Sequence, residues 1–248
     1  MLVWIRFLTR LLNTWFAAPV DAVMRAVHIE PTYPRHPIGT TLTEELLVFF
    51  LLIAFFLIAR FTLSVEKPGK VQHLAEMVHE FVDDQSQQVT GRSESPFLPL
   101  LTALVLYILL CNLFGLLPGL ETPTANPAVP LGFAICAFVY YNWNGLRTQG
   151  PIGYAKHFMG PAWWIAPLMF PIEIISHLAR ILSLTVRLFA NMLASDLITI
   201  IFFSMVPLAL PIVGLGLHLF VAVIQAYIFM LLTMIYLGEA TAQHSEHH

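Results

Sequence analysis

Apolar stretches alternate with short polar segments along most of this chain. A membrane-spanning helix needs about 20 predominantly apolar residues, and five stretches approach or exceed that length. The predicted spans are residues 46–63, 97–117, 128–143, 172–206 and 217–237. The pattern therefore predicts an all-α integral membrane protein with about five transmembrane helices.

Two further segments have one apolar face and one polar face. In residues 1–17, apolar positions recur at helical spacing opposite Arg6 and Arg10, as in a helix that lies in the membrane interface. Residues 70–90 carry an apolar stripe opposite several charges, which predicts an amphipathic helix on the membrane surface or against a neighbour. We divide the chain into an N-terminal helix and proline-rich linker, residues 1–43, and one multi-pass membrane domain, residues 44–248.

The fourth span is longer than a membrane is thick. Residues 172–206 contain neither glycine nor proline and would form about 52 Å of helix at 1.5 Å per residue. A bilayer core is only about 30 Å thick, so this helix should be steeply tilted. Pro207 and Pro211 then predict a turn. The last two helices should therefore form a long, tilted hairpin.

Composition excludes several classes of protein. Hydrophobic residues make up 58% of the chain and charged residues 11%, whereas a soluble domain is about a quarter charged. The net charge of −3 leaves no basic patch for nucleic acid. Cys111 and Cys136 lie inside apolar runs, which argues against a disulfide framework. A soluble domain, a disordered chain, a coiled coil and a nucleic-acid binder are all excluded.

Basic residues predict the orientation, because they favour cytoplasmic loops. The loops after the first and third spans carry lysines and arginines, and the loops after the second and fourth carry none. Arginines near the N-terminus favour the opposite orientation, but the short loops are the better guide. We expect the N-terminus outside, and the surface helix, the 144–161 loop and the C-terminus in the cytoplasm.

Few ionisable side chains lie within the predicted hairpin. Between Pro161 and Gly238 they are Glu173, His177, Arg180, Arg187, Asp196 and His218. A charge at the membrane centre costs about 2.5–3.5 kcal/mol on insertion scales, so such residues usually serve a function. At 100° per residue, one polar stripe contains Glu173, Ser176, Arg180, Ser183, Arg187 and Asn191. Asp196 lies on the opposite face.

The turn of the hairpin predicts which residues share a depth. Asp196 and His218 lie at similar distances from the turn and should meet on the outer side of the membrane. Asn191 and Gln225 match in the same way, deeper in the membrane. Glu173 lies toward the cytoplasmic side.

Arg187 is suited to a barrier between the two sides. Its guanidinium stays protonated at physiological pH, whereas Asp196 and His218 can gain and lose protons. A proton entering from the outer side would meet a fixed positive charge before reaching Glu173. The chain offers no proton-carrying group between these two sides, which predicts a moving partner that carries the proton past Arg187.

The same residues resemble a known family. The run from Pro171 through Arg187 to Met192 closely resembles subunit a of F-type ATP synthase, as does the last helix with His218, Gln225 and Tyr236. The segments 68–70 and 112–118 are also similar, and the likeness covers roughly residues 40–240.

This resemblance implies a role for each residue. Arg187 would be the family's essential arginine facing a ring of c subunits, and Glu173 would lie by the cytoplasmic half-channel. The outer half-channel would be lined by Asn191, Asp196, His218 and Gln225. Supporting positions would be Asn112, Arg180, Ser183 and Tyr236.

The resemblance also implies a setting for the protein. It would be a non-catalytic channel subunit without a cofactor or metal, and it would couple the proton gradient to rotation of the ring and to ATP synthesis on other subunits. Its partners would be the c ring, the b-subunit peripheral stalk, the remaining ATP synthase subunits and membrane lipid. An acid at 196 with His218 resembles the bacterial pattern, which favours the bacterial inner membrane over the mitochondrial one.

Two positions depart from the family's pattern. Asp196 stands where Glu or His is frequent, and Ile181 stands where proline is common, which leaves the long helix unbroken. H⁺ and Na⁺ both remain possible ions.

Other readings of the residues stay open. Glu173 and His177 could simply bond each other or Arg180, and Asp196 with His218 could be a stabilising polar pair. A secondary transporter would show internal repeats and broken helices, and a metalloenzyme would need clustered ligands; neither pattern is evident. The histidines at 244, 247 and 248 lack the spacing of a helical metal site and predict a solvated tail.

Overall fold

The computed structural model describes residues 3–26, 39–64, 69–90, 96–117, 120–159, 166–205 and 210–241. Every regular element in these ranges is helical. The elements are α1 (Val3–Ala26), α2 (Thr40–Phe61), α3 (Lys70–Thr90), α4 (Leu98–Phe114), a 3-10 turn η1 (Pro123–Ala125), α5 (Ala128–Met159), α6 (Ala166–Met205) and α7 (Leu210–Thr241). Residues 27–38, most of the predicted proline-rich linker, and the predicted C-terminal tail lie outside the described residues.

Among the described residues, three helices are by length and composition able to cross a membrane: α2, α7 and residues 167–205 of α6. The predicted span at 97–117 corresponds to α4, which is apolar but shorter, and the span at 128–143 corresponds to the first half of α5. The predicted class, an all-α integral membrane protein, is confirmed.

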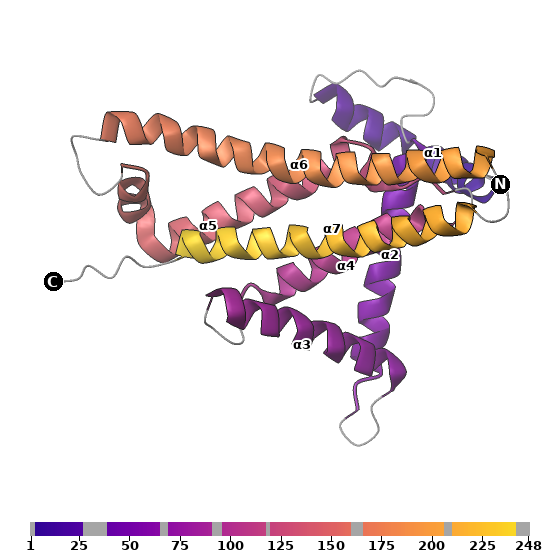
Figure 1. The fold of residues 1–248 in the computed structure, drawn as a ribbon, viewed down its shortest axis with the longest axis horizontal. Helices are drawn as coiled ribbons and strands as arrows, with labels where there is room; N and C mark the ends of the chain where they lie inside the picture. Colours follow the sequence, from indigo (N-terminus) through magenta and orange to yellow (C-terminus); the bar gives the residue numbers. More distant parts are fainter. Residues whose placement is uncertain are drawn as a thin grey trace.

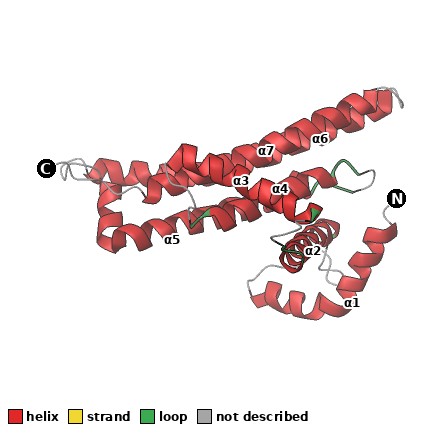
Figure 2. Ribbon diagram, turned by 90° about the horizontal axis from the view of Figure 1, so that it is seen from below, coloured by secondary structure: helices red, strands yellow, loops and turns green. Residues whose placement is uncertain are grey.

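Helices α6 and α7 form the predicted hairpin. They lie closest near the turn and diverge toward their other ends, where α5 packs on both, and α2 crosses their direction at a steep angle (Figure 1). Seen from below, α2 is viewed almost along its own axis while the hairpin lies across the view (Figure 2). At 1.5 Å per residue, the 22 residues of α2 span about 33 Å, close to the thickness of a bilayer core, and the 40 residues of α6 span about 60 Å. If α2 crosses the membrane upright, the hairpin is strongly tilted.

The hydrophobic core lies between α4, α5, α6 and α7. Its largest fully buried side chains include Leu101, Ile108, Leu188, Met192 and Met230. The polar stripe of α6 does not point into this core, because none of its six residues is buried. The core therefore fixes the hairpin while leaving one edge of α6 accessible.

The amphipathic helix predicted at 70–90 is confirmed as α3, with the same bounds. It packs on α2, α4 and α7, where Val82 is fully buried and the hydroxyl of Tyr227 donates to Gln85 Oε1 at 2.7 Å. The surface helix is thereby attached to the last helix of the hairpin. Helix α1 contacts α2 through a 2.9 Å hydrogen bond between Thr9 and Thr43.

Several predicted boundaries are wrong. α1 extends to Ala26 rather than ending at residue 17, α2 begins at Thr40 rather than at 46, and α6 begins at Ala166 rather than at 172. The segment 144–161 was expected to be a loop, but α5 continues to Met159 with a kink at Gly150, whose φ of 73° suits glycine. The last helix begins at Leu210 rather than near 217, because Pro211 lies in its first turn, where the missing N–H has no helical partner to lose.

Candidate functional site

Asp196 of α6 and His218 of α7 form a contact near the turn of the hairpin. Nδ1 of His218 lies 3.1 Å from Oδ1 of Asp196. The histidine side chain is 1% exposed and the aspartate side chain 24% exposed. The predicted match in depth between these residues is therefore confirmed.

The second ring nitrogen of His218 determines how many protons this pair holds. Nε2 lies 2.9 Å from the backbone carbonyl oxygen of Asn112. A carbonyl oxygen only accepts, so Nε2 must carry a hydrogen. The contact between Nδ1 and Asp196 then needs one further proton, held either as imidazolium with carboxylate or as neutral imidazole with carboxylic acid. The pair as a whole shares that single proton.

Asn112 links α4 to α7 and to the loop before α5. Its side-chain amide donates to the carbonyl oxygen of Ala222 at 3.1 Å, and its Oδ1 accepts from the hydroxyl of Thr124 at 2.6 Å. Asn112 is fully buried. It therefore holds in place the carbonyl group that fixes the His218 ring.

Thr122 is a further residue of the site that sequence patterns did not indicate. Its hydroxyl donates to Oδ1 of Asp196 at 3.0 Å, the same atom that faces His218. Thr122 lies in an irregular segment, where no periodicity predicts which way a side chain points. The only sequence feature that could have pointed to Thr122 is its position in the short segment between two predicted spans.

A cavity of about 330 Å³ adjoins Asp196. Its lining includes Glu121, Thr122, Asp196, Thr199 and Phe203. A volume of this size holds several water molecules. Asp196 is therefore placed to exchange a proton with water.

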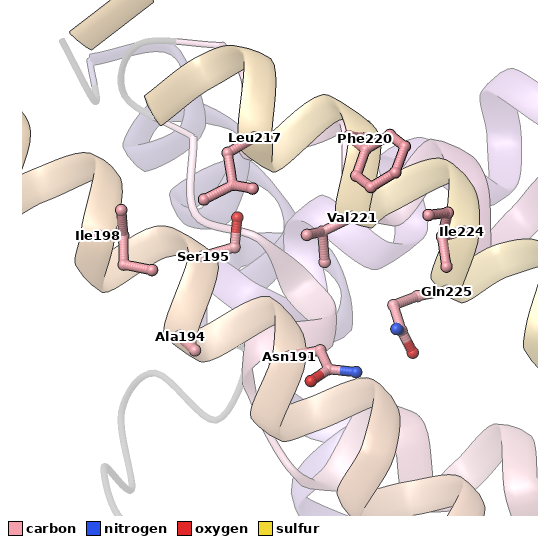
Figure 3. A pocket seen from close by; sticks show the side chains of 9 residues that line it. All are labelled: Asn191, Ala194, Ser195, Ile198, Leu217, Phe220, Val221, Ile224 and Gln225. Carbon is pink, nitrogen blue, oxygen red and sulfur yellow. The ribbon is translucent and has the colours of Figure 1, made fainter. Parts of the chain in front are cut away.

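A second cavity, of about 270 Å³, lies between α6 and α7. Most of its lining is apolar, but Asn191 and Gln225 bring their amide groups to the same end of it from the two helices (Figure 3). The predicted match in depth between Asn191 and Gln225 is thus confirmed. These amides could hold water between the Asp196–His218 pair and the level of Arg187.

Arg187 lies at the accessible edge of α6. Its guanidinium donates to the hydroxyl of Ser183, one turn earlier, at 3.2 Å. Within the described part of the chain, no acidic side chain comes within ion-pair distance of Arg187. A structural salt bridge inside the described bundle therefore does not account for this arginine.

Glu173 and His177 form a second polar group toward the other end of α6. Nε2 of His177 lies 3.5 Å from Oε1 of Glu173. Nδ1 of the same ring is 2.7 Å from the hydroxyl of Tyr141, which stacks on the ring. Tyr141 of α5 is 2% exposed, because its ring packs against His177 of α6 and Tyr236 of α7.

Arg180 has a partner that was not anticipated. It pairs with Glu239 at 2.8 Å and lies over the ring of Tyr236, with 4.7 Å between the guanidinium carbon and the ring centroid. Glu239 falls just beyond residue 237, the predicted end of the last helix, so the pattern of charges within the hairpin does not include it. Arg180 therefore ties α6 to α7 and is not the partner of Glu173.

The described residues contain no cluster of side chains suited to a metal ion. The described residues bring together three groups suited to proton exchange: the Asp196–His218 pair beside a cavity, Arg187 without an acidic partner in these ranges, and Glu173 beside His177.

This chain is similar to known proteins over most of its length. The sequence profile of a family described as ATP synthase A chain matches residues 43–238. The ATP synthase subunit a of Koribacter versatilis (strain Ellin345) is 50% identical over 234 residues, which cover 94% of this chain and 96% of that protein. The ATP synthase subunit a of Solibacter usitatus (strain Ellin6076) is 43% identical over 230 residues, which cover 93% and 98% of the two chains.

Proposed function

The chain belongs to the ATP synthase A chain family, and from this premise we propose that it is the stator subunit that conducts protons past a rotating ring of c subunits. The chain forms two half-channels that open on opposite sides of the membrane. A proton crosses between them on a c-subunit carboxylate. ATP is made or hydrolysed on other subunits of the complex.

The single observation that carries this proposal is the position of Arg187. An arginine in a membrane-spanning helix is costly unless it is paired or faces water, and no acidic residue of the described chain pairs with it. Arg187 lies on the edge of α6 that the core leaves accessible. A carboxylate from another subunit would supply the missing partner.

The outer half-channel is formed by Asp196 and His218, followed by Asn191 and Gln225. Protons enter through the cavity beside Asp196 and continue along the two amides toward the edge of α6. At that edge, the guanidinium of Arg187 repels a free proton but attracts the carboxylate of an arriving c subunit. The carboxylate takes up its proton on one side of Arg187 only.

The inner half-channel begins at Glu173, with His177 beside it. A c subunit that has carried its proton round the ring releases it here. A membrane potential of 100 mV contributes about 2.3 kcal/mol for each elementary charge that crosses. Because Arg187 separates the two half-channels, this free energy is available only through rotation.

The proposal includes the setting of the chain. We place it in the bacterial inner membrane, with the N-terminus outside and the C-terminus in the cytoplasm, as the distribution of basic residues indicates. The tilted hairpin faces the c ring, and the b-subunit peripheral stalk holds the chain against rotation.

Disulfide cross-linking in the assembled complex tests whether this edge of α6 faces the ring. Val186, next to Arg187, is 50% exposed. In a Cys136→Ser background, Val186→Cys should form a disulfide with a cysteine placed beside the c-subunit carboxylate. Cys111 is buried and can stay.

Val139→Cys on α5 is the matched control, because this valine is 57% exposed but lies on a different helix. A cross-link at 186 and none at 139 supports the proposal. Equal cross-linking at both positions, or none at 186 in an assembled complex, contradicts it.

A further inference from the structure

The segment between α4 and α5, residues 120–126, is attached to two different helices. Oε1 of Glu44 on α2 accepts a hydrogen bond from the backbone N–H of Glu121 at 3.3 Å. The hydroxyl of Thr124 donates to Oδ1 of Asn112 on α4 at 2.6 Å. Thr122 and Pro123 lie between these two attachment points.

The hydroxyl of Thr122 and the ring of His218 meet at one oxygen atom, Oδ1 of Asp196. Gly115 makes room for both. A Cβ atom at position 115 would overlap Oγ1 of Thr122 and would lie 2.9 Å from Cε1 of His218. The close approach of these side chains therefore requires glycine at 115.

Glu44 is buried in a way that stability alone does not explain. The residue is 1% exposed, and its Oε2 has no hydrogen-bond partner among the described residues. Burying a carboxyl group with one oxygen unpaired costs free energy. Val48, one turn further along α2, packs in an apolar cluster with Cys111 and Phe114. An apolar residue at 44 would be the less costly choice if only packing mattered.

We propose that Thr122 is a positioning residue for Asp196 and that Glu44 acts through the backbone to hold Thr122 in place. This inference rests on the proposed function of Asp196 in the outer half-channel. The polar contacts of Asp196 with described residues all end on Oδ1. Thr122 and His218 thus fix one oxygen of the carboxyl group and leave Oδ2 for proton exchange with water in the adjoining cavity.

Passive proton conduction tests the role of Thr122. Membrane vesicles carrying the complex are stripped of the catalytic head, and proton flux is measured under an imposed potential. Thr122→Val keeps the shape of threonine but removes the hydroxyl. We expect it to lower the flux about fivefold to tenfold, the loss equivalent to one hydrogen bond. Thr122→Ser, which keeps the donor, should conduct nearly as well as the wild type.

The role of Glu44 is tested by a second pair of variants. Glu44→Ala removes the acceptor for the N–H of Glu121 and should lower the flux as Thr122→Val does. Glu44→Gln keeps an acceptor oxygen and should restore it, which a role in carrying protons would not allow. The double variant Thr122→Val/Glu44→Ala should conduct no worse than Thr122→Val alone, because both changes act through one hydroxyl.

Each outcome decides a separate point. Normal flux in Thr122→Val overturns the inference. This variant alone is a sufficient test if Glu44→Ala fails to assemble with the c ring. Flux in Glu44→Gln as low as in Glu44→Ala overturns the positioning role of Glu44. Asp196→Asn distinguishes failure of this inference from failure of the proposed function. If Asp196→Asn blocks the flux while Thr122→Val conducts normally, only the inference about Thr122 fails. If Asp196→Asn conducts normally, the proposed function of Asp196 fails.

Discussion

Nδ1 of His218 lies 3.1 Å from Oδ1 of Asp196, and the two residues come from different arms of the α6–α7 hairpin. Because Nε2 of the same ring donates to the carbonyl of Asn112, a proton cannot enter the ring at Nε2 and leave at Nδ1 without breaking that bond. In the proposed outer half-channel, Asp196 is therefore the group that exchanges protons with water, and His218 shares its proton.

This arrangement predicts non-additive effects of substitutions at the two positions. Asp196→Asn should lower ATP-driven proton pumping about a hundredfold or more, the range that proton-transfer groups contribute. His218→Gln should also lower it, while the double variant should pump no less than Asp196→Asn alone. Initial rates of acidification in vesicles provide the measurement. If the fold-decrease in pumping of the double variant equals the product of the two single-variant decreases, the two residues act independently.

Tyr141→Phe tests whether the inner polar group belongs to the proton path. The change removes the hydroxyl that lies 2.7 Å from Nδ1 of His177 but keeps the stacked ring. We expect pumping to fall about threefold to tenfold, the effect of one lost hydrogen bond, and Glu173→Gln to lower it further. Tyr140→Phe, on the adjacent and more exposed ring, is the control. Unchanged pumping in Tyr141→Phe would assign this group a structural role.

Arg180→Met should affect stability rather than conduction. It removes the ion pair with Glu239, whose side chain is 51% exposed, and the contact with the Tyr236 ring. An exposed ion pair contributes about 0–1 kcal/mol and a cation–π contact about 0.5–1 kcal/mol. The variant chain should therefore dissociate from the complex at a lower temperature than the wild-type chain. Passive proton flux per assembled complex should be unchanged. A loss of flux in fully assembled complexes would place Arg180 on the path.

Asn112→Leu should be the most destabilising of these changes. It leaves the hydroxyl of Thr124 and the carbonyl of Ala222 without their partner in a buried site, and an unsatisfied buried group costs about 1–3 kcal/mol. Asn142→Leu is a milder comparison, since Asn142 is only half-buried. Thermal dissociation of the purified complex measures both. Equal stability of the Asn112→Leu variant and the wild type would contradict the anchoring role.

Helical geometry explains why the residues of the hairpin could be predicted. Two antiparallel arms rise by the same distance per residue, so counting from the turn paired Asp196 with His218 and Asn191 with Gln225, and the structure brings both pairs together. The stripe that contains Arg187 likewise follows from 100° per residue.

Residues outside regular helices could not be found in this way. Thr122 reaches Asp196 from an irregular segment, where the backbone path rather than a period sets the direction of a side chain. Glu44 preceded the predicted first span, but α2 begins earlier and buries it. Its partner is a backbone N–H, which every residue except proline carries, so no residue pattern points to it.

The central claim is that Arg187 separates two half-channels, and ATP-driven pumping in vesicles that carry Arg187→Ala tests it most directly. Passive proton flux is measured in parallel after the catalytic head is removed. If Arg187 is the barrier, pumping is lost in this variant while passive flux persists or rises, because the barrier is gone but both water-accessible routes remain. Near-normal pumping in this variant would contradict the claim.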